Sequence, residues 1–127
     1  MNFEKVVFGF FILLAATLNF GFVYGDIGAV EHHHQSEFFA AIVVNLIATV
    51  LKFGDRTHVG AIHLASSLVA LLQLSGAAAV WLVAADKAGG AIAPETMASI
   101  VSLSAGALLA NIVSVVILIV ETTMQRR

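Results

Sequence analysis

Four long apolar segments, separated by short polar stretches, dominate the chain. Four stretches contain no Asp, Glu, Lys or Arg: residues 6–25, 38–51, 57–85 and 96–120. A helix that rises about 1.5 Å per residue needs about 20 apolar residues to cross a bilayer. Three stretches meet this length, and the second is long enough once Ser36, Phe53 and the long Lys52 side chain are included. The pattern predicts an all-α integral membrane four-helix bundle, a single transmembrane domain over residues 1–127 with spans at about 6–24, 36–53, 57–85 and 94–120.

The composition supports membrane insertion and excludes several functions. Of the 127 residues, 60% are hydrophobic and 11% are charged, whereas soluble domains have about 45–50% apolar and about 25% charged residues. A net charge of −2 without a basic run argues against a nucleic-acid partner. Without cysteine there is no disulfide, thiolate nucleophile or iron–sulfur site. No nucleotide motif or catalytic constellation is visible, so we do not expect an enzyme or an active pump.

The basic residues predict the orientation of the bundle. If all four segments span, Lys87 lies on one side of the membrane, and the other basic residues lie on the opposite side: Lys5, Lys52, Arg56, Arg126 and Arg127. Basic residues near the ends of spans are concentrated in the cytoplasm. We therefore expect both termini to be cytoplasmic.

The segment TVLKFGDRTH, residues 49–58, resembles the selectivity filter of potassium channels but lacks a feature that the filter needs. Such a filter uses glycines so that successive backbone carbonyl oxygens point inward. Here Leu51 and Lys52 stand in place of one glycine, and a lysine would repel the cation. We interpret the segment as a cytoplasmic turn in which Gly54 ends one helix and Asp55 or Thr57 starts the next.

Each predicted span carries one amide side chain: Asn19, Asn45, Gln73 and Asn111. A side-chain amide in hydrocarbon needs a partner in another helix or a wet cavity. The amides therefore either hold helices together or line a path, and Asn45 followed by Asn111 are the best candidates for lining. His63 in the third span is the next candidate, either bonded to a nearby serine or serving a proton or ion path.

Small residues recur every four positions along the fourth span: Ala98, Ser102, Gly106, Ala110 and Ser114. Such a stripe permits close approach of a second helix, within the bundle or between subunits. Four helices packed at normal density enclose a filled core. A pore would therefore require a homo-oligomer in which helices from several copies line an axis.

The predicted outer loop is rich in histidine and glutamate: Glu31, His32, His33, His34 and Glu37. This combination suits a divalent ion such as zinc, nickel or copper, with His32, His33 and His34 as the candidate ligands. A solvated loop without a bound metal has the same composition. In a homo-oligomer, Glu31 and Glu37 would form an acidic outer mouth that attracts cations.

The run VVNLIATVLKFGDRTHVGAIHLA, residues 43–65, together with the four-span layout, resembles a family of small bacterial membrane proteins of unknown function. The resemblance covers most of the chain. It implies a multi-pass protein of the bacterial inner membrane, and it assigns no functional residues.

Three functions fit these features. The leading hypothesis is a homo-oligomeric cation channel or passive pore in the lipid bilayer, with the amides along the path and an acidic, histidine-rich mouth. The first alternative is a small accessory or assembly subunit of a larger membrane complex. The second is a metal-responsive membrane sensor that uses the histidine cluster.

Overall fold

The computed structural model describes residues 3–87 and 89–125, and every regular element in these residues is helical. The elements are α1 (Phe3–Val23), the short 3₁₀ helix η1 (Val30–His32), α2 (Gln35–Lys52), α3 (His58–Lys87) and α4 (Pro94–Gln125). Each of the four α-helices is long and apolar enough to cross a membrane. The prediction of an all-α protein with four helices long and apolar enough to span a membrane is therefore confirmed.

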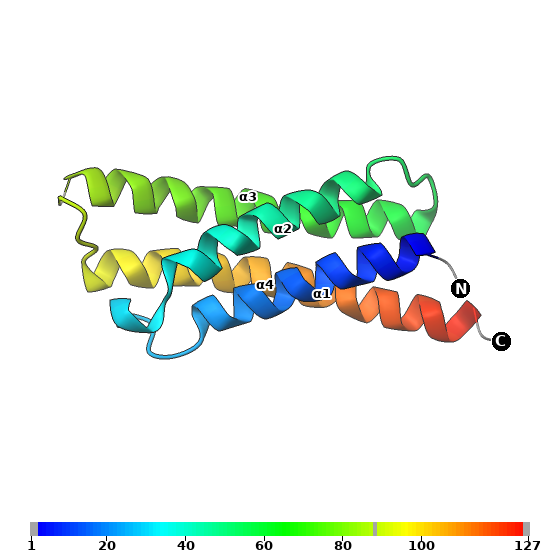
Figure 1. The fold of residues 1–127 in the computed structure, drawn as a ribbon, viewed down its shortest axis with the longest axis horizontal. Coiled ribbons are helices and arrows are strands. Elements are labelled where there is room, and N and C mark those ends of the chain that lie inside the picture. Colours follow the sequence, from blue (N-terminus) through cyan, green and yellow to red (C-terminus); the bar gives the residue numbers. More distant parts are fainter. Residues whose placement is uncertain (1–2, 88, 126–127) are drawn as a thin grey trace.

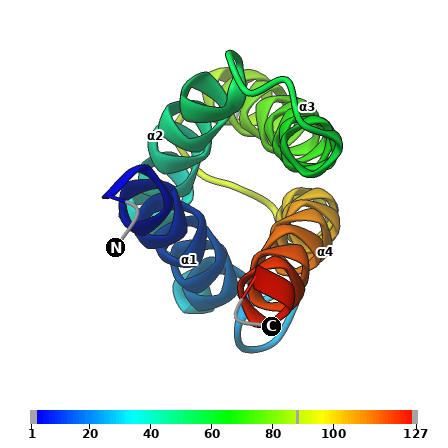
Figure 2. The same ribbon diagram turned by 90° about the vertical axis from the view of Figure 1, so that its right-hand side faces the viewer.

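The four helices run up and down in a ring. α1 packs against α2 and α4, and α3 packs against α2 and α4, as Figure 2 shows along the axis of the bundle. The two ends of the described chain lie together at one end of the bundle (Figure 1). We call this the terminal end, formed by residues 3–8, 51–60 and 118–124. The opposite end, formed by residues 22–36, 84–87 and 89–96, is called the loop end.

The turn that resembled an ion filter is a tight connection between α2 and α3. The hydroxyl of Thr57 accepts a hydrogen bond from the amide of Gly60 at 2.9 Å and so caps the start of α3. Asp55 in turn accepts hydrogen bonds from the amide of Thr57 at 2.9 Å and from its hydroxyl at 2.7 Å. Thr57 is thus the residue that caps α3, and Asp55 supports it.

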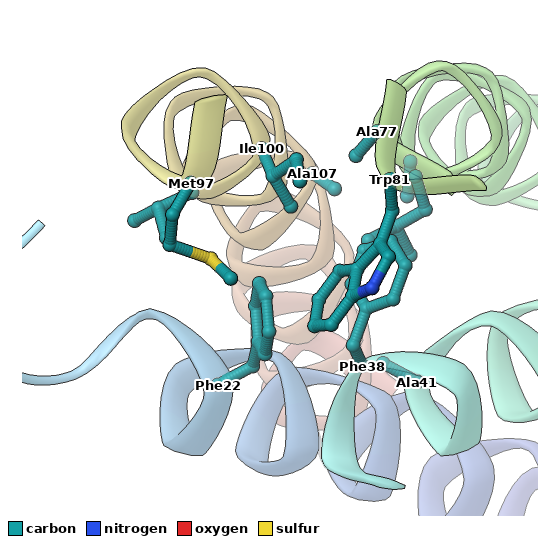
Figure 3. Close-up of a cluster of buried hydrophobic side chains, with 11 residues drawn as sticks. Phe22, Phe38, Ala41, Ala77, Trp81, Met97, Ile100 and Ala107 are labelled. Atoms are coloured by element: carbon teal, nitrogen blue, oxygen red, sulfur yellow. The ribbon is translucent and has the colours of Figure 1, made fainter. Parts of the chain in front are cut away.

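Aromatic side chains fill the core near the loop end. Figure 3 shows Phe22 of α1, Phe38 of α2 and Trp81 of α3 packed together, with Met97 of α4 beside Phe22. The Phe38 and Trp81 rings are stacked with centroids 5.2 Å apart, and Phe22 lies 4.8 Å from Phe38. We call Phe22, Phe38 and Trp81 the aromatic cluster. It makes this part of the core dry and tightly packed.

Candidate functional site

The rest of the bundle interior is rich in polar side chains. Eight polar residues drawn from all four helices are buried there, and we call them the polar core: Asn19, Asn45, Thr49, His63, Ser67, Ser104, Asn111 and Ser114. They occupy positions on the inner faces of the helices, where membrane bundles carry small residues and polar side chains that hydrogen-bond to neighbouring helices. The interior therefore combines two apolar clusters with polar side chains from all four helices.

Contacts between the helices show which members of the polar core lie at the same height. Gln73 of α3 lies against Gly106 of α4, and Leu118 of α4 packs against Gly9 of α1. Since the neighbouring helices run antiparallel, these pairs place Asn111 level with Ser67. The contact of Phe22 with Phe38 sets the register of α1 and α2 in the same way and brings Asn45 to this height. By this register Asn45, Ser67 and Asn111 lie within about one helical turn of the same height near the middle of the bundle, and we call these three residues the middle layer.

Many atoms of the polar core have no hydrogen-bond partner among the described residues. They are Asn45 Oδ1, both ring nitrogens of His63, Ser67 Oγ, Ser104 Oγ, both amide atoms of Asn111, and Ser114 Oγ. An unsatisfied polar group in hydrocarbon costs several kcal/mol. These side chains therefore do not serve to hydrogen-bond one helix to another. Their unsatisfied atoms are suited to binding water or an ion inside the bundle.

Two amides of the polar core differ in whether their hydrogen bonds are satisfied. The Asn19 amide, oriented to suit its surroundings, donates to the carbonyl of Ser104 and accepts from the amide of Leu108, both at 3.1 Å. Asn19 thus ties α1 to α4, as expected of a structural amide. Asn45 donates through Nδ2 to the carbonyl of Ala41 at 2.9 Å, which leaves Oδ1 as an acceptor without a donor.

At the terminal end, Phe8 separates the polar core from a surface cleft. The cleft has a volume of about 690 Å³ and is lined by Phe3, Glu4, Val7, Phe8, Leu51, Lys52, Gly54, Asp55 and Arg56. The inner edge of Phe8 meets His63, with ring centroids 4.9 Å apart, and Lys52 Nζ lies 4.3 Å from the centroid of the Phe8 ring. His63 is 1% exposed. Phe8 therefore covers His63 on the side of the cleft.

Two ion pairs lie at the terminal end near this cleft. Lys52 Nζ lies 3.3 Å from Asp55 Oδ2, and Lys5 Nζ lies 3.6 Å from Glu121 Oε1. The hydrogen bonds from the hydroxyl and amide of Thr57, followed by the bond and charge of Lys52, lower the pKa of Asp55 below its ordinary value. Asp55 is consequently a carboxylate at neutral pH, and the cleft carries charges of both signs.

The histidines of the outer loop are held apart by the backbone. His32 accepts a hydrogen bond from the amide of Asp26 through Nδ1 at 3.0 Å. His33 is buried, and its two ring nitrogens lie 2.5 Å from the carbonyl oxygen of Phe22 and 2.7 Å from that of Asp26. His34 is exposed at the start of α2. No three His, Asp or Glu side chains in the described part of the chain are placed to hold a metal ion together.

The two glutamates predicted at the outer mouth both lie at the loop end. Glu31 is exposed on η1, whereas the half-buried Glu37 carboxylate lies against the backbone of Gly21, where a Cβ atom would collide with it. Glu37 thus joins the first turn of α2 to α1. Glu31 is free to face the surrounding solution.

The small residues of α4 mainly serve the contact with α3. Gly106 allows the Gln73 amide to lie where its Cβ would be, within 2.6 Å of the ideal Cβ position. The stripe does not face a single neighbour along its whole length. Ser102 is exposed, Ala98, Gly106 and Ala110 are half-buried, and Ser114 is buried. On the outer surface, a groove of about 410 Å³ follows this contact, lined by Ala65, Ser66, Val69, Gln73, Gly106, Leu109, Ala110 and Val113.

A comparison with protein families finds a match to a family of unknown function, DUF6394, over residues 32–122. This match covers well over half of the chain. The chain belongs to the DUF6394 family. No curated protein and no solved structure matches it. The part that matches DUF6394 includes α2, α3 and most of α4, and therefore all of the middle layer, whereas α1 with Asn19 and Phe8 precedes it.

For this DUF6394 protein, sequence reasoning named four of the eight polar-core residues as lining candidates, and it did not single out Thr49, Ser67, Ser104 or the apolar cover Phe8. Asn19, Asn45, His63 and Asn111 were predicted as candidates, and all four are buried inside a single bundle. Ser67 and Ser104 share the inner face with them, and a signal was present for the former, because Ser67 follows His63 by one helical turn. Nothing in the sequence distinguishes Phe8 from the other phenylalanines of α1.

Proposed function

We propose that the protein passes protons or small cations passively through the polar core of its bundle. The observation that carries this proposal is the set of buried polar atoms without partners in the polar core. Polar side chains that only hold membrane helices together have partners on neighbouring helices, as Asn19 does. Unsatisfied groups in the interior of a membrane protein are typical of a route for water, ions or protons.

The proposed route begins in the cleft at the terminal end. It passes Phe8, reaches His63 and Ser114, continues through the middle layer and ends at the aromatic cluster. Phe8 and the aromatic cluster close the two ends in the described conformation. Hydrophobic constrictions of this kind gate channels by excluding water. Passage therefore requires both to move aside, and we propose that this structure is the closed state.

Because the candidate residues are buried inside one bundle, the proposed route does not run along an axis shared by several copies of the protein. Asn45 and Asn111 are each 0% exposed, and His63 is 1% exposed, all within one bundle. A shared axis would need these side chains on the outer surface. We accordingly place the route inside each protomer and assign assembly to a different surface.

The charged residues orient the route. Of the basic residues in the described part of the chain, Lys5, Lys52 and Arg56 lie at the terminal end and Lys87 lies at the loop end. By the positive-inside rule, we propose that the terminal end faces the cytoplasm, and the family resemblance favours the bacterial inner membrane. Arg126 and Arg127, which also entered the prediction of orientation, lie outside the described residues.

The test is ion flux into liposomes that contain the purified protein. Protons, sodium and potassium would each be followed with an ion-sensitive dye trapped inside. We expect flux above that of empty liposomes, and we expect Asn111→Leu to reduce it about tenfold or more, because a lost polar contact of about 1–2 kcal/mol raises the barrier accordingly. The matched control is Ser102→Ala, which alters an exposed residue of the same helix. Absence of flux for all three ions would overturn the proposal.

A second candidate function, membership of a larger assembly, is supported by the groove between α3 and α4. Its small residues and the partly exposed Gln73 would let another transmembrane helix approach closely. We propose a second copy of this chain as the occupant. Cross-linking of single-cysteine variants at Ala110 would produce dimers in that case, with Val43, exposed on α2, as the control position. A monomer that co-purifies with a different membrane protein would instead identify an accessory subunit.

A further inference from the structure

We infer that the middle layer is a binding site for a single dehydrated monovalent cation. This inference rests on the proposed function and names the substrate class of its route. It begins with the atoms that the layer offers. Asn45 Oδ1, Ser67 Oγ and Asn111 Oδ1 come from three different helices, and Ser114 Oγ lies one turn from Asn111; none of these oxygens has a partner among the described residues.

The orientation of Asn45 favours a cation over an anion. Its Nδ2 is already bonded to the carbonyl of Ala41, and the hydroxyl of Thr49 is bonded to the carbonyl of Asn45 at 2.8 Å. The amide of Asn45 is therefore held with its oxygen as the unsatisfied atom. This oxygen would repel an anion, whereas it would coordinate a cation.

The charge of the cation follows from the neutrality of the ligands. Amide and hydroxyl oxygens carry no formal charge, and residues 6–25, 38–51, 57–85 and 96–120 contain no Asp or Glu. Divalent ions such as calcium and magnesium are bound in proteins with the help of carboxylates, which repay their larger cost of dehydration. Neutral oxygens alone replace the hydration shell of potassium in channel filters, and backbone carbonyls contribute to sodium sites in transporters.

The layer is also enclosed well enough to hold a dehydrated ion. Asn45, Ser67, Asn111 and Ser114 are each 0% exposed, and the small Ala15 of α1, also 0% exposed, occupies the remaining side at the same height. Toward the loop end, the aromatic cluster excludes water. Toward the terminal end, His63 and Phe8 cover the layer. An ion in this position would have to exchange its hydration water for protein oxygens.

The experiment is equilibrium binding to the purified protein in detergent, which does not depend on flux. Thermal unfolding would be recorded with sodium, potassium, rubidium or N-methylglucamine chloride at one ionic strength, and rubidium binding would be measured with a radioactive tracer. We expect saturable stabilisation by at least one of the small cations, because a ligand that binds the folded state stabilises it by mass action. N-methylglucamine is too large to enter and should have no such effect.

Variants separate a binding role from a structural one. Asn111→Leu and Ser114→Ala should each weaken cation binding about ten- to a hundredfold, as expected for a lost bond to a charged group. Without the cation, Asn111→Leu should unfold at the same temperature as the unaltered protein or higher, because it removes two unsatisfied polar atoms from the core. Ser102→Ala, at an exposed position of the same helix, should leave binding unchanged.

The possible outcomes distinguish this site from the proposed function. Equal stabilisation by all four salts, or no rubidium binding, would show that the layer holds water alone and would overturn the site. A loss of stability in Asn111→Leu without any change in cation binding would overturn it as well. Cation binding without flux would support the site and overturn the proposed function.

Discussion

The rings of Phe8 and His63 meet edge to face, with centroids 4.9 Å apart and an angle of 65° between their planes. This geometry is a favourable arrangement for aromatic rings. Its position gives it further importance, because Phe8 lines the cleft at the terminal end whereas His63 is 1% exposed behind it. One aromatic ring thus forms the boundary between the solution and the polar core.

Replacing Phe8 should open this boundary. We expect Phe8→Ala to increase cation or proton flux into liposomes several-fold, since water would reach His63 from the cleft. The control is Phe10→Ala, because Phe10 belongs to the same helix and is 59% exposed. Loss of a buried phenylalanine also costs about 3–5 kcal/mol, so Phe8→Leu serves as a milder variant. Equal flux in the Phe8 and Phe10 variants would contradict the assignment of Phe8 as the boundary.

His33 should be important for stability even though it lies in a loop. Its ring bridges the carbonyl oxygens of Phe22 and Asp26, so it satisfies backbone acceptors at the end of α1. We expect His33→Ala to lower the free energy of unfolding by about 1–3 kcal/mol. Denaturant titration in detergent would measure this change.

The neighbouring histidine provides the matched control. His34 is exposed and makes no capping hydrogen bond with its side chain. The variant His34→Ala should therefore change stability by no more than about 0.5 kcal/mol. Similar losses in the two variants would show that His33 does not have the bridging role assigned to it.

Asp55 should make the stability of the α2–α3 turn depend on acidity. Its pKa is lowered in the folded protein by the hydrogen bonds from Thr57 and by Lys52. The stabilisation is therefore fully present above the ordinary carboxyl value of 3.8 and is lost as the pH falls through the lowered pKa. At neutral pH, Asp55→Asn should cost about 1 kcal/mol.

Thermal unfolding between acidic and neutral pH would test this dependence. The difference in stability between the unaltered protein and Asp55→Asn should be constant near neutral pH and should shrink below the ordinary carboxyl value. Asp86→Asn, at an exposed position near the end of α3, is the control and should differ little from the unaltered protein at any pH. A difference that grows in acid would have the wrong sign for this mechanism.

The contact of Gln73 with Gly106 should decide how α4 tolerates an added methyl group. Alanine is favoured over glycine inside a helix by about 0.5–1 kcal/mol. At Gly76 the new Cβ would lie 3.9 Å from Leu103, so Gly76→Ala should gain this amount. At Gly106 it would lie 2.6 Å from the Gln73 amide, so Gly106→Ala should gain less or lose stability.

A double-mutant cycle would isolate this contact. Once the Gln73 side chain is removed by Gln73→Ala, Gly106→Ala should be as favourable as Gly76→Ala. The measurement is the free energy of unfolding of the four combinations in one detergent. Additive effects would mean that the two residues do not constrain each other in the membrane bundle.

The four helices could be predicted from the sequence because each depends on a local pattern, a long apolar stretch without charges. Charge-free stretches of sufficient length predict helices whatever their neighbours, and Pro94 and the turn at Gly54 are placed as expected at a helix start and after a helix end. The position of the middle layer could not be predicted in this way. Asn45, Ser67 and Asn111 come to the same height through the register of three helix pairs, and that register depends on long-range packing.

The outer loop shows a second limit of the sequence. Three adjacent histidines suggest a shared ligand, but neighbouring residues of an irregular segment point in different directions. Here the 3₁₀ turn of η1 places His32 against the backbone of Gly25 and sends His33 into the interior. Adjacency in the chain is thus a poor guide to convergence in space wherever the backbone turns.

Trp81 is the single tryptophan of the chain, and it is stacked on Phe38 within the aromatic cluster. No other indole contributes to the ultraviolet emission of the protein. The emission therefore reports on the aromatic cluster alone, and its wavelength depends on how much water surrounds the Trp81 indole. Any stimulus that admits water between α1, α2 and α3 would shift the emission to the red. The unlabelled protein consequently carries an optical reporter of its own opening, at the point where the proposed route is blocked.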